Sequence, residues 1–242
     1  MRRIRAETKG ATFTAFVKDP YMGPDTADIV WVPDHDELTG ENVIKTALTP
    51  RRVTPAKLAA ARAAPLEVLT RLKSPRVAVL IGGDSVNHRF KPADIALLSE
   101  RLALLAGSGA SLMGTLSRRT PPALRETVGA VFARIGRYLW DGQGQNPFIS
   151  LLGLADAFVV TADSVGMVGE AAATGRPILV FEPSGGHRKI TFYLDELRRR
   201  GIVHNFAGHL AGTPYQPLDS TFAVASRIAE AFRRHRSARF KS

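Results

Sequence analysis

Short, continuous apolar runs alternate along this sequence with segments whose apolar residues recur at helical spacing. The clearest runs are residues 77–81, 111–115, 157–161 and 177–181. Unbroken apolar strands are typical of a parallel sheet with both faces covered, because neither face of such a strand meets water. The alternation therefore predicts an α/β fold built on a parallel sheet.

Helices are expected between these runs, where proline or a capping residue opens a helical pattern and glycine closes it. Their expected positions are from Pro92 to before Gly107, after the N-cap Thr120, after the N-cap Asn146, 167–174, 188–200 and 219–234. A further short strand is expected at 137–140. Upstream, we expect strands at 11–17 and 28–32 and a helix that opens at Thr54 and ends before Pro65.

The upstream part holds fewer predicted elements than a complete doubly wound lobe. We therefore expect residues 1–70 to form a partial N-terminal Rossmann-like lobe. Residues 71–242 are expected to form a nucleotide-binding Rossmann-like lobe that includes the C-terminal helix.

The composition excludes several classes of protein. The 242 residues include no cysteine, which rules out disulfides, thiolate zinc sites and a cysteine nucleophile. No apolar run approaches the roughly 20 residues of a membrane-spanning helix. No apolar segment follows the basic N-terminus, as one would in a secretory signal. We therefore expect a cytoplasmic protein.

The formal net charge of +11 fits a phosphorylated ligand, an anionic membrane surface or simply a basic, solvated surface. Much of the excess lies at 198–200 and 233–241. No basic motif is interleaved with aromatic residues, so a nucleic-acid partner is not expected. The basic C-terminal helix predicts either a solvated tail or a peripheral contact with anionic lipid at the inner face of the membrane. The sequence identifies no protein partner.

Candidate ligand-binding residues follow the predicted strands, at the carboxyl ends where open α/β sheets bind ligands. Small residues at Gly82, Gly83 and Ser85 would let a phosphate or sugar approach the backbone, with free N–H groups to bind an anion. The alternative is a tight connection without a ligand. After the next strand, Arg118 and Arg119 suit a diphosphate, the alternative being a solvated loop.

The turn Asp163–Ser164 opens a later helix, where hydroxyl and N–H groups can hold a phosphate at the positive helix end. Either residue can instead be only an N-cap. Glu170, further along that helix, can accept hydrogen bonds from a ribose diol or be an exposed helical carboxylate. The histidines lack the spacing of metal ligands, so no metal is expected.

Several motifs of the chain resemble those of one family. In residues 146–183, a strand and a Ser/Thr turn precede a helix in which Glu170 is followed by Gly175 and Pro177, and this resembles the nucleotide-binding lobe of GT-B glycosyltransferases. Together with GGDSVNHRF, LSRRTPP and DGQGQNP, the segment is similar to the family named after the mitochondrial fission ("elongated mitochondria") protein of plants, which has many bacterial members. The upstream ADIVWVPDHDEL, NVIKT and RRVTPAKL also fit that family, so the resemblance covers nearly the whole chain.

This resemblance implies a GT-B-like fold of two Rossmann-type lobes with parallel sheets. Family members usually begin with a further strand and helix, so the N-terminal lobe is expected to be truncated here. The resemblance also implies that Glu170 binds the ribose and that Asp163 and Ser164 lie near the diphosphate. The residues expected to bind a nucleotide sugar are Gly82, Gly83, Ser85, Ser117, Arg118, Arg119, Asn146, Asp163, Ser164 and Glu170.

Three functions are compatible with these features. The first is a metal-independent glycosyltransferase whose substrate is a nucleotide sugar and which needs no cofactor, with the diphosphate stabilised by arginines and helix-end N–H groups. An inverting enzyme also needs a general base, for which His35 and Asp36 are the clustered candidates upstream. The second is a non-catalytic scaffold that recruits a partner to a membrane surface, since the plant member is associated with recruiting a dynamin-type fission machine. The third is a sugar-nucleotide epimerase.

Overall fold

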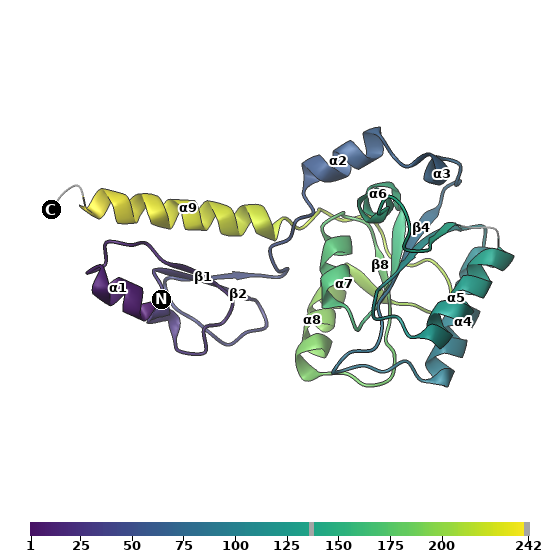
Figure 1. Cartoon of the computed structure of the whole chain (residues 1–242), viewed down its shortest axis with the longest axis horizontal. Helices are drawn as coiled ribbons and strands as arrows, with labels where there is room; N and C mark the ends of the chain where they lie inside the picture. The colour runs from purple at the N-terminus through teal and green to yellow at the C-terminus, as the bar shows by residue number, and fades with distance from the viewer. Residues whose placement is uncertain (136–137, 240–242) are drawn as a thin grey trace. The chain divides into compact units, whose positions relative to one another are not determined.

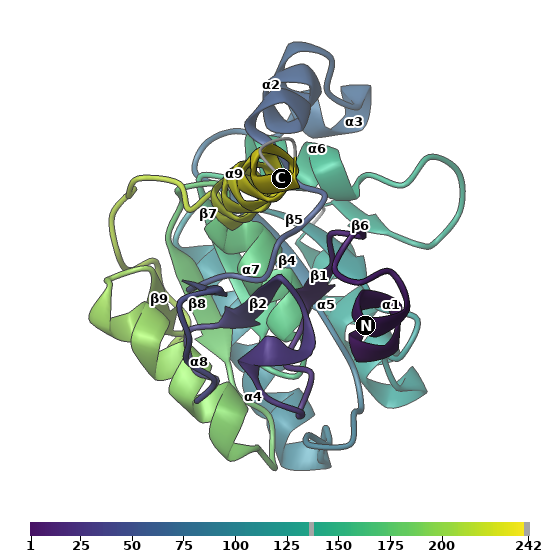
Figure 2. The same cartoon turned by 90° about the vertical axis from the view of Figure 1, so that its left-hand side faces the viewer.

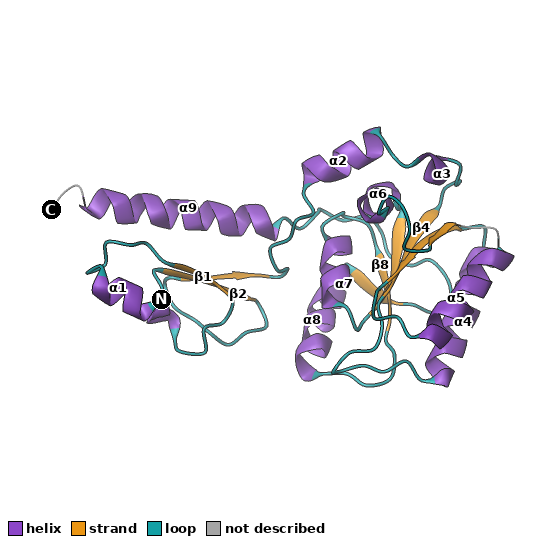
Figure 3. Cartoon of the chain, in the orientation of Figure 1, coloured by secondary structure: helices purple, strands orange, loops and turns teal. Residues whose placement is uncertain are grey.

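The structure is a computed structural model that describes residues 1–135 and 138–239. It divides the chain into two compact units, a small unit of residues 1–52 and 219–242 and a large unit of residues 53–218. Each unit is built on its own parallel sheet (Figures 1 and 3). This confirms the α/β class with parallel sheets that the alternating pattern predicts.

The sheet of the large unit has six parallel strands in the order β6-β5-β4-β7-β8-β9. Their bounds are β4 (Arg76–Ile81), β5 (Ser111–Leu116), β6 (Tyr138–Trp140), β7 (Ala157–Thr161), β8 (Ile178–Phe181) and β9 (Val203–Asn205). Val77 at the centre pairs with Leu112 of β5 on one side and Ala157 of β7 on the other. Counted along the chain the order is 3-2-1-4-5-6, which is that of a Rossmann fold.

Helices cover both faces of this sheet. The helices of the large unit are α2 (Pro55–Ala63), α3 (Glu67–Thr70), α4 (Pro92–Gly107), α5 (Pro122–Arg134), α6 (Phe148–Leu154), α7 (Val165–Ala172) and α8 (Arg188–Arg199). Figure 1 shows α4 and α5 on one side of the sheet and α7 and α8 on the other, and Figure 2 views the molecule from the side of α7 and α8. The buried residues Leu98 and Leu102 of α4 and Val128 of α5 pack against Val77 and Val79 of β4. Every residue of β4 after Arg76 is buried, so both faces of the strand are covered and its sequence is an unbroken apolar run.

The small unit has three parallel strands, β1 (Ala15–Val17), β2 (Ile29–Pro33) and β3 (Val43–Thr46), in the order β1-β2-β3. It also contains α1 (Arg2–Glu7), the short 3-10 helix η1 (Pro24–Thr26) and the C-terminal helix α9 (Ser220–Arg239). One stripe of α9 packs on one face of this sheet. The contact joins Val224, Ile228 and Ala231 to Ile29, Trp31 and Ile44. Among the described residues, no helix is both long enough and apolar enough to cross a membrane.

The predicted helices and strands of the large unit agree with the structure to within a few residues, except that Arg137 lies outside the described residues. Phe240 and Lys241 of the basic tail lie outside them as well. The short elements α1, α3 and β9 are not anticipated from the sequence. Elements of three to six residues are too short to show a clear periodic pattern.

The division into units differs from the predicted lobes 1–70 and 71–242. The C-terminal helix groups with the small unit, because its apolar stripe is buried on the small sheet. In turn α2 groups with the large unit, because Arg62 Nε donates to the carbonyl oxygen of Gly153 in α6 at 3.0 Å. A Cβ on Gly153 would lie 3.1 Å from Ala61 Cβ, so α2 and α6 pack closely. The chain therefore changes units between Arg52 and Val53.

Gly129 and Gly109 of the large unit allow a matched prediction, because neither has an atom close to the place where a Cβ would be. Gly129 lies inside α5 with open space where a Cβ would be, so Gly129→Ala should raise the free energy of unfolding by about 0.5–1 kcal/mol. Gly109 has similar open space but a φ of +93°. Gly109→Ala should therefore lower stability by about 1–2 kcal/mol, since an L-residue is strained there. Urea unfolding of both variants checks the opposite signs, and equal effects would contradict the backbone assignment.

Candidate functional site

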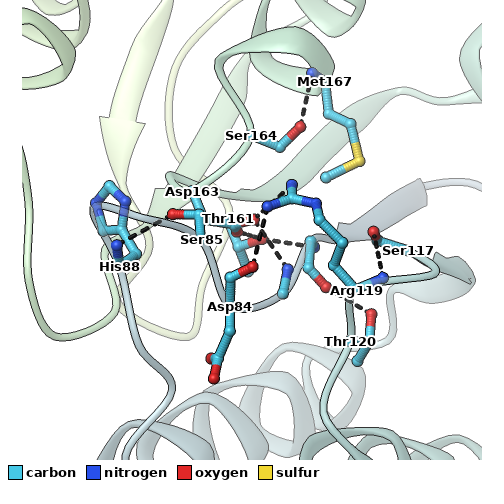
Figure 4. A network of polar contacts seen from close by, with 12 residues as sticks. Asp84, Ser85, His88, Ser117, Arg119, Thr120, Thr161, Asp163, Ser164 and Met167 are labelled. Atoms are coloured by element: carbon cyan, nitrogen blue, oxygen red, sulfur yellow. Dashed lines mark hydrogen bonds and ion pairs between the residues drawn. The ribbon is translucent and has the colours of Figure 1, made fainter.

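The carboxyl ends of β4, β5 and β7 lie side by side at the centre of the large sheet, because β4 pairs with both neighbours. The chain then leaves β4 and β5 toward one face and β7 toward the other (Figure 1). Such a switch point is where open α/β sheets bind ligands. The loops 82–91, 117–121 and 162–164 meet here, as Figure 4 shows for their polar residues.

Asp163 is the residue on which these loops converge, and its side chain is fully buried. Its Oδ2 accepts the N–H of Gly83 at 2.9 Å, and its Oδ1 accepts the hydroxyl of Thr161 at 2.7 Å. Arg119 Nη2 lies 3.3 Å from the same Oδ2 (Figure 4). Asp163 therefore joins the loops after β4 and β5 to the end of β7.

The neighbours of Asp163 act against the effect of burial on its pKa. Burial raises the pKa of the Asp163 carboxyl above its ordinary value, because a charged group is costly away from water. Hydrogen bonds from Thr161 and Gly83, and electrostatic interactions with Arg119 and His88, offset part of this rise in pKa. The carboxylate is thus engaged with protein groups, and its placement near a bound diphosphate stays a prediction.

The absence of a side chain at Gly82 and Gly83 lets other parts of the protein approach their backbone closely. The N–H of Gly82 donates to Thr161 Oγ1 at 2.8 Å, and that of Gly83 to Asp163. A Cβ on Gly82 would lie 2.0 Å from Asp163 Oδ2, and one on Gly83 would lie 2.0 Å from the carbonyl oxygen of Arg119. The prediction that these N–H groups are free to bind an anion is wrong, because neighbouring side chains accept them. The structure shows the alternative, a tight connection.

The loop after β5 supplies two exposed cations. Ser117 Oγ accepts the N–H of Arg119 at 3.0 Å and so shapes the turn. The Arg119 side chain reaches back across the switch point, with Nη1 donating to the carbonyl oxygen of Asp84 at 3.1 Å and Nη2 directed at Asp163. Arg118 beside it is exposed. Both guanidinium groups remain candidates for binding a diphosphate.

Two predicted helix caps differ in detail. Thr120 does not cap α5, whose N-cap position is Pro121. The buried Thr120 hydroxyl donates instead to the carbonyl oxygen of Gly82 at 2.5 Å, so the tertiary contact replaces the local one. Asn146 Oδ1 accepts the N–H of Phe148, the first residue of α6, at 2.9 Å. Asn146 thus satisfies a helix-end donor as expected, although the helix begins one residue later.

The N-terminus of α7 lies at the same edge of the sheet. Ser164 is its N-cap, with Oγ accepting the N–H of Met167 at 3.4 Å, which confirms one of the two predicted caps. The N–H groups of Val165 and Gly166 have no partner within the helix, as at any helix start. This positive end can receive an anion. Glu170 lies in the second turn of α7 and is half-buried.

Sequence reasoning did not single out His88. Ser85 Oγ accepts the N–H groups of Asn87 and His88 at 3.2 and 3.1 Å, and the Ser85 N–H donates to the carbonyl oxygen of His88 at 3.0 Å. An isolated antiparallel bridge joins His88 to Gly185 after β8. His88 is 3% exposed, and its buried Nδ1 has no hydrogen-bond partner among the described residues. Its presence in GGDSVNHRF was the available signal, but a lone loop histidine does not reveal its burial.

Other predicted residues lie outside the contacts around Asp163. His35 and Asp36 are in the turn after β2, in the small unit, where Lys45 Nζ donates to the carbonyl oxygen of Asp36 at 2.5 Å. Their role as a general base stays a prediction. Asn146 precedes α6 in the large unit. The described part of the chain contains no group of three or more His, Cys, Asp or Glu side chains placed to hold a metal ion.

The two parallel sheets and the strand order of the large unit define a GT-B-like α/β protein of Rossmann type, as expected from the sequence. Among solved structures, a Listeria monocytogenes protein named for UDP-N-acetylglucosamine 2-epimerase superposes with a TM-score of 0.53 at 20% identity. The match covers 88% of this chain and 60% of that protein. At this identity the likeness shows the fold alone.

A model of the mitochondrial fission ELM1 family matches residues 1–232. The mitochondrial fission protein ELM1 of Arabidopsis thaliana is 32% identical over 260 residues, which cover 94% of this chain and 59% of the relative. RP120, an uncharacterised protein of Rickettsia prowazekii, is 29% identical over 169 residues, which cover 66% of this chain and 48% of that protein. The chain therefore belongs to the mitochondrial fission ELM1 family, and it spans less than two-thirds of the length of either relative.

Proposed function

We propose that the large unit binds a nucleoside diphosphate sugar at the carboxyl ends of β4, β5 and β7, and that the chain acts as a glycosyltransferase. The observation that carries the proposal is the position of Arg118, Arg119 and the capped end of α7 at one switch point. Guanidinium groups and helix-end N–H groups both favour a diphosphate. The net charge of +11 attracts an anionic ligand as well.

Glycosyl transfer breaks the bond between the sugar and the diphosphate, which gains negative charge as it leaves. Fixed hydrogen-bond donors aimed at that charge stabilise the transition state. Arg118, Arg119 and the N–H groups of Val165 and Gly166 are the proposed donors. Glu170 is the proposed ribose ligand, because one carboxylate can accept hydrogen bonds from both hydroxyls of a diol.

A nucleotide panel tests this proposal by thermal shift and calorimetry. One of UDP, GDP, ADP, CMP and dTDP should stabilise the protein by about 2.7 kcal/mol when present at 100 times its Kd. Glu170→Ala should weaken that binding by about tenfold to hundredfold, since a charged hydrogen-bond acceptor is lost. Stabilisation by a single nucleotide would also identify the donor class.

The matched control is Glu126→Ala, which removes an exposed helical carboxylate from α5. It should bind the nucleotide as the wild type does. A folded wild type that responds to no nucleotide would refute the proposal. Equal binding by Glu170→Ala and Glu126→Ala would refute the role of Glu170 while leaving the site itself in place.

Two other functions use the same chain differently. A sugar-nucleotide epimerase would bind the same donor but interconvert sugars without releasing the nucleoside diphosphate, so product analysis distinguishes it from a transferase. A scaffold at an anionic membrane surface is favoured by α9, where Arg233 and Arg236 are exposed and Phe222 is 70% exposed. If none of the five nucleotides stabilised the protein, the scaffold would be the better proposal.

A further inference from the structure

Arg119 contacts the buried carboxylate of Asp163, while part of its own side chain is exposed to solvent at the switch point. Its guanidinium lies 3.3 Å from Asp163 Oδ2 and 3.1 Å from the carbonyl oxygen of Asp84. These are long distances for hydrogen bonds made by a charged donor, which are usually about 2.7–2.9 Å. The Arg119 side chain is 47% exposed, whereas that of Asp163 is 0% exposed. A ligand can therefore reach Arg119 but not Asp163.

We propose that Arg119 is exchanged between Asp163 and a bound diphosphate, and that Asp163 takes up a proton from solvent when Arg119 leaves it. The inference rests on the proposed function and adds a coupling between ligand binding and protonation at the same site. The proton ends on a carboxyl oxygen of Asp163, which becomes neutral. Asp163 is then a positioning residue, because it acts on the ligand only through Arg119.

Among the described residues, Arg119 is the ionic partner of Asp163, and the acidic side chains of the neighbouring loops, Asp84 and Glu182, have partners of their own. The interaction with His88 also lowers the Asp163 pKa, but by less than the interaction with Arg119 does. The Asp84 carboxylate, in the same loop as His88, accepts the N–H of Phe90 at 3.0 Å and faces Arg89. From the loop after β8, Glu182 is ion-paired with Arg198. No other ion pair to Asp163 is found among the described residues.

One guanidinium cannot neutralise a buried carboxylate and a diphosphate at the same time. A buried carboxylate that loses its cation is more stable in the protonated form, because desolvation penalises the charged form. Burial already raises the pKa of Asp163, so removal of Arg119 raises it further. Binding coupled to proton uptake must become weaker as the pH rises through the Asp163 pKa of the complex.

The test follows the carboxyl carbon of Asp163 by NMR in protein labelled with 13C-aspartate, with the signal assigned by Asp163→Asn. The probe is P1,P2-dimethyl diphosphate, which carries the diphosphate without base or sugar and has no proton to lose near neutral pH. The probe should raise the Asp163 pKa in the wild type. Arg119→Met should raise that pKa by about one pH unit or more without the probe, and the probe should then have no further effect.

Arg118→Met is the matched control, because it removes an equally charged and exposed neighbour that has no ion pair to Asp163 among the described residues. Without the probe, its Asp163 titration should match that of the wild type. An unchanged Asp163 pKa in Arg119→Met, or in wild type with the probe, would overturn the inference whatever the nucleotide panel shows. If no nucleotide binds but the probe acts through Arg119, the exchange is supported and the nucleotide-sugar function fails.

Discussion

Gly82→Ala is expected to destabilise the large unit by about 3 kcal/mol or more, although it adds a single methyl group. The new Cβ would lie 2.0 Å from Oδ2 and 2.3 Å from Oδ1 of Asp163. The carboxylate cannot move aside cheaply, since it is fully buried and bonded to Gly83 and Thr161. Either the hydrogen bonds break or the loop after β4 shifts, and both outcomes remove contacts at the centre of the site.

Urea unfolding measures this effect, with Gly107→Ala as the matched control. Gly107 ends α4 and has open space where a Cβ would be, so its substitution should not lower stability. Gly83→Ala should resemble Gly82→Ala, because its Cβ would meet the backbone carbonyl of Arg119 at 2.0 Å. If Gly82→Ala proved as stable as Gly107→Ala, the close approach of Asp163 to this loop would be disproved.

Asp163→Ala is expected to lower the free energy of unfolding by about 2–6 kcal/mol, because two buried donors lose their acceptor at about 1–3 kcal/mol each. These donors are the N–H of Gly83 and the hydroxyl of Thr161. The exposed side of Arg119 can be solvated instead, so its loss adds little. Asp163→Asn keeps one acceptor oxygen and should cost less than alanine, which denaturant unfolding of the two variants can measure.

The difference in stability between wild type and Asp163→Asn should also depend on pH. The folded-state pKa of Asp163 is raised above its ordinary value of 3.8, so the folded protein binds this proton more tightly than the unfolded chain does. The contribution of Asp163 to stability is therefore full below that value and declines as the pH rises through the folded-state pKa. Wild type should lose stability relative to Asp163→Asn over this window. A wild type that gains stability relative to Asp163→Asn as the pH rises would contradict the burial of the carboxylate.

Most elements of the large unit could be predicted because their signals are local. An apolar run such as 157–161 is recognisable as a buried strand without knowledge of its neighbours, and Gly175 marks the end of the helix before the next strand. The strand order could be expected only by resemblance. The assignment of α9 could not be made, since its apolar stripe shows that a face is buried but not on which sheet.

The residues of the site divide in the same way. Ser164 was predictable as a cap because it bonds to Met167, three residues further along its own helix. Thr120 had the same local signal, yet its hydroxyl bonds to Gly82, which is distant in sequence. No local pattern shows that His88 is buried, because its bridge partner Gly185 lies far away in the sequence, after another strand.

From the amino-acid sequence one can therefore predict the α/β class, the positions of the main helices and strands, the family and the loops at which a ligand site is expected. These properties follow from periodicity, caps and motifs, which act between residues a few positions apart. The tertiary structure was needed to show that Gly82 and Gly83 accommodate Asp163 and Arg119, and that Asp163 rather than a ligand accepts the Gly83 N–H. Parallel strands bring together loops far apart in sequence, and no local pattern records which groups then meet.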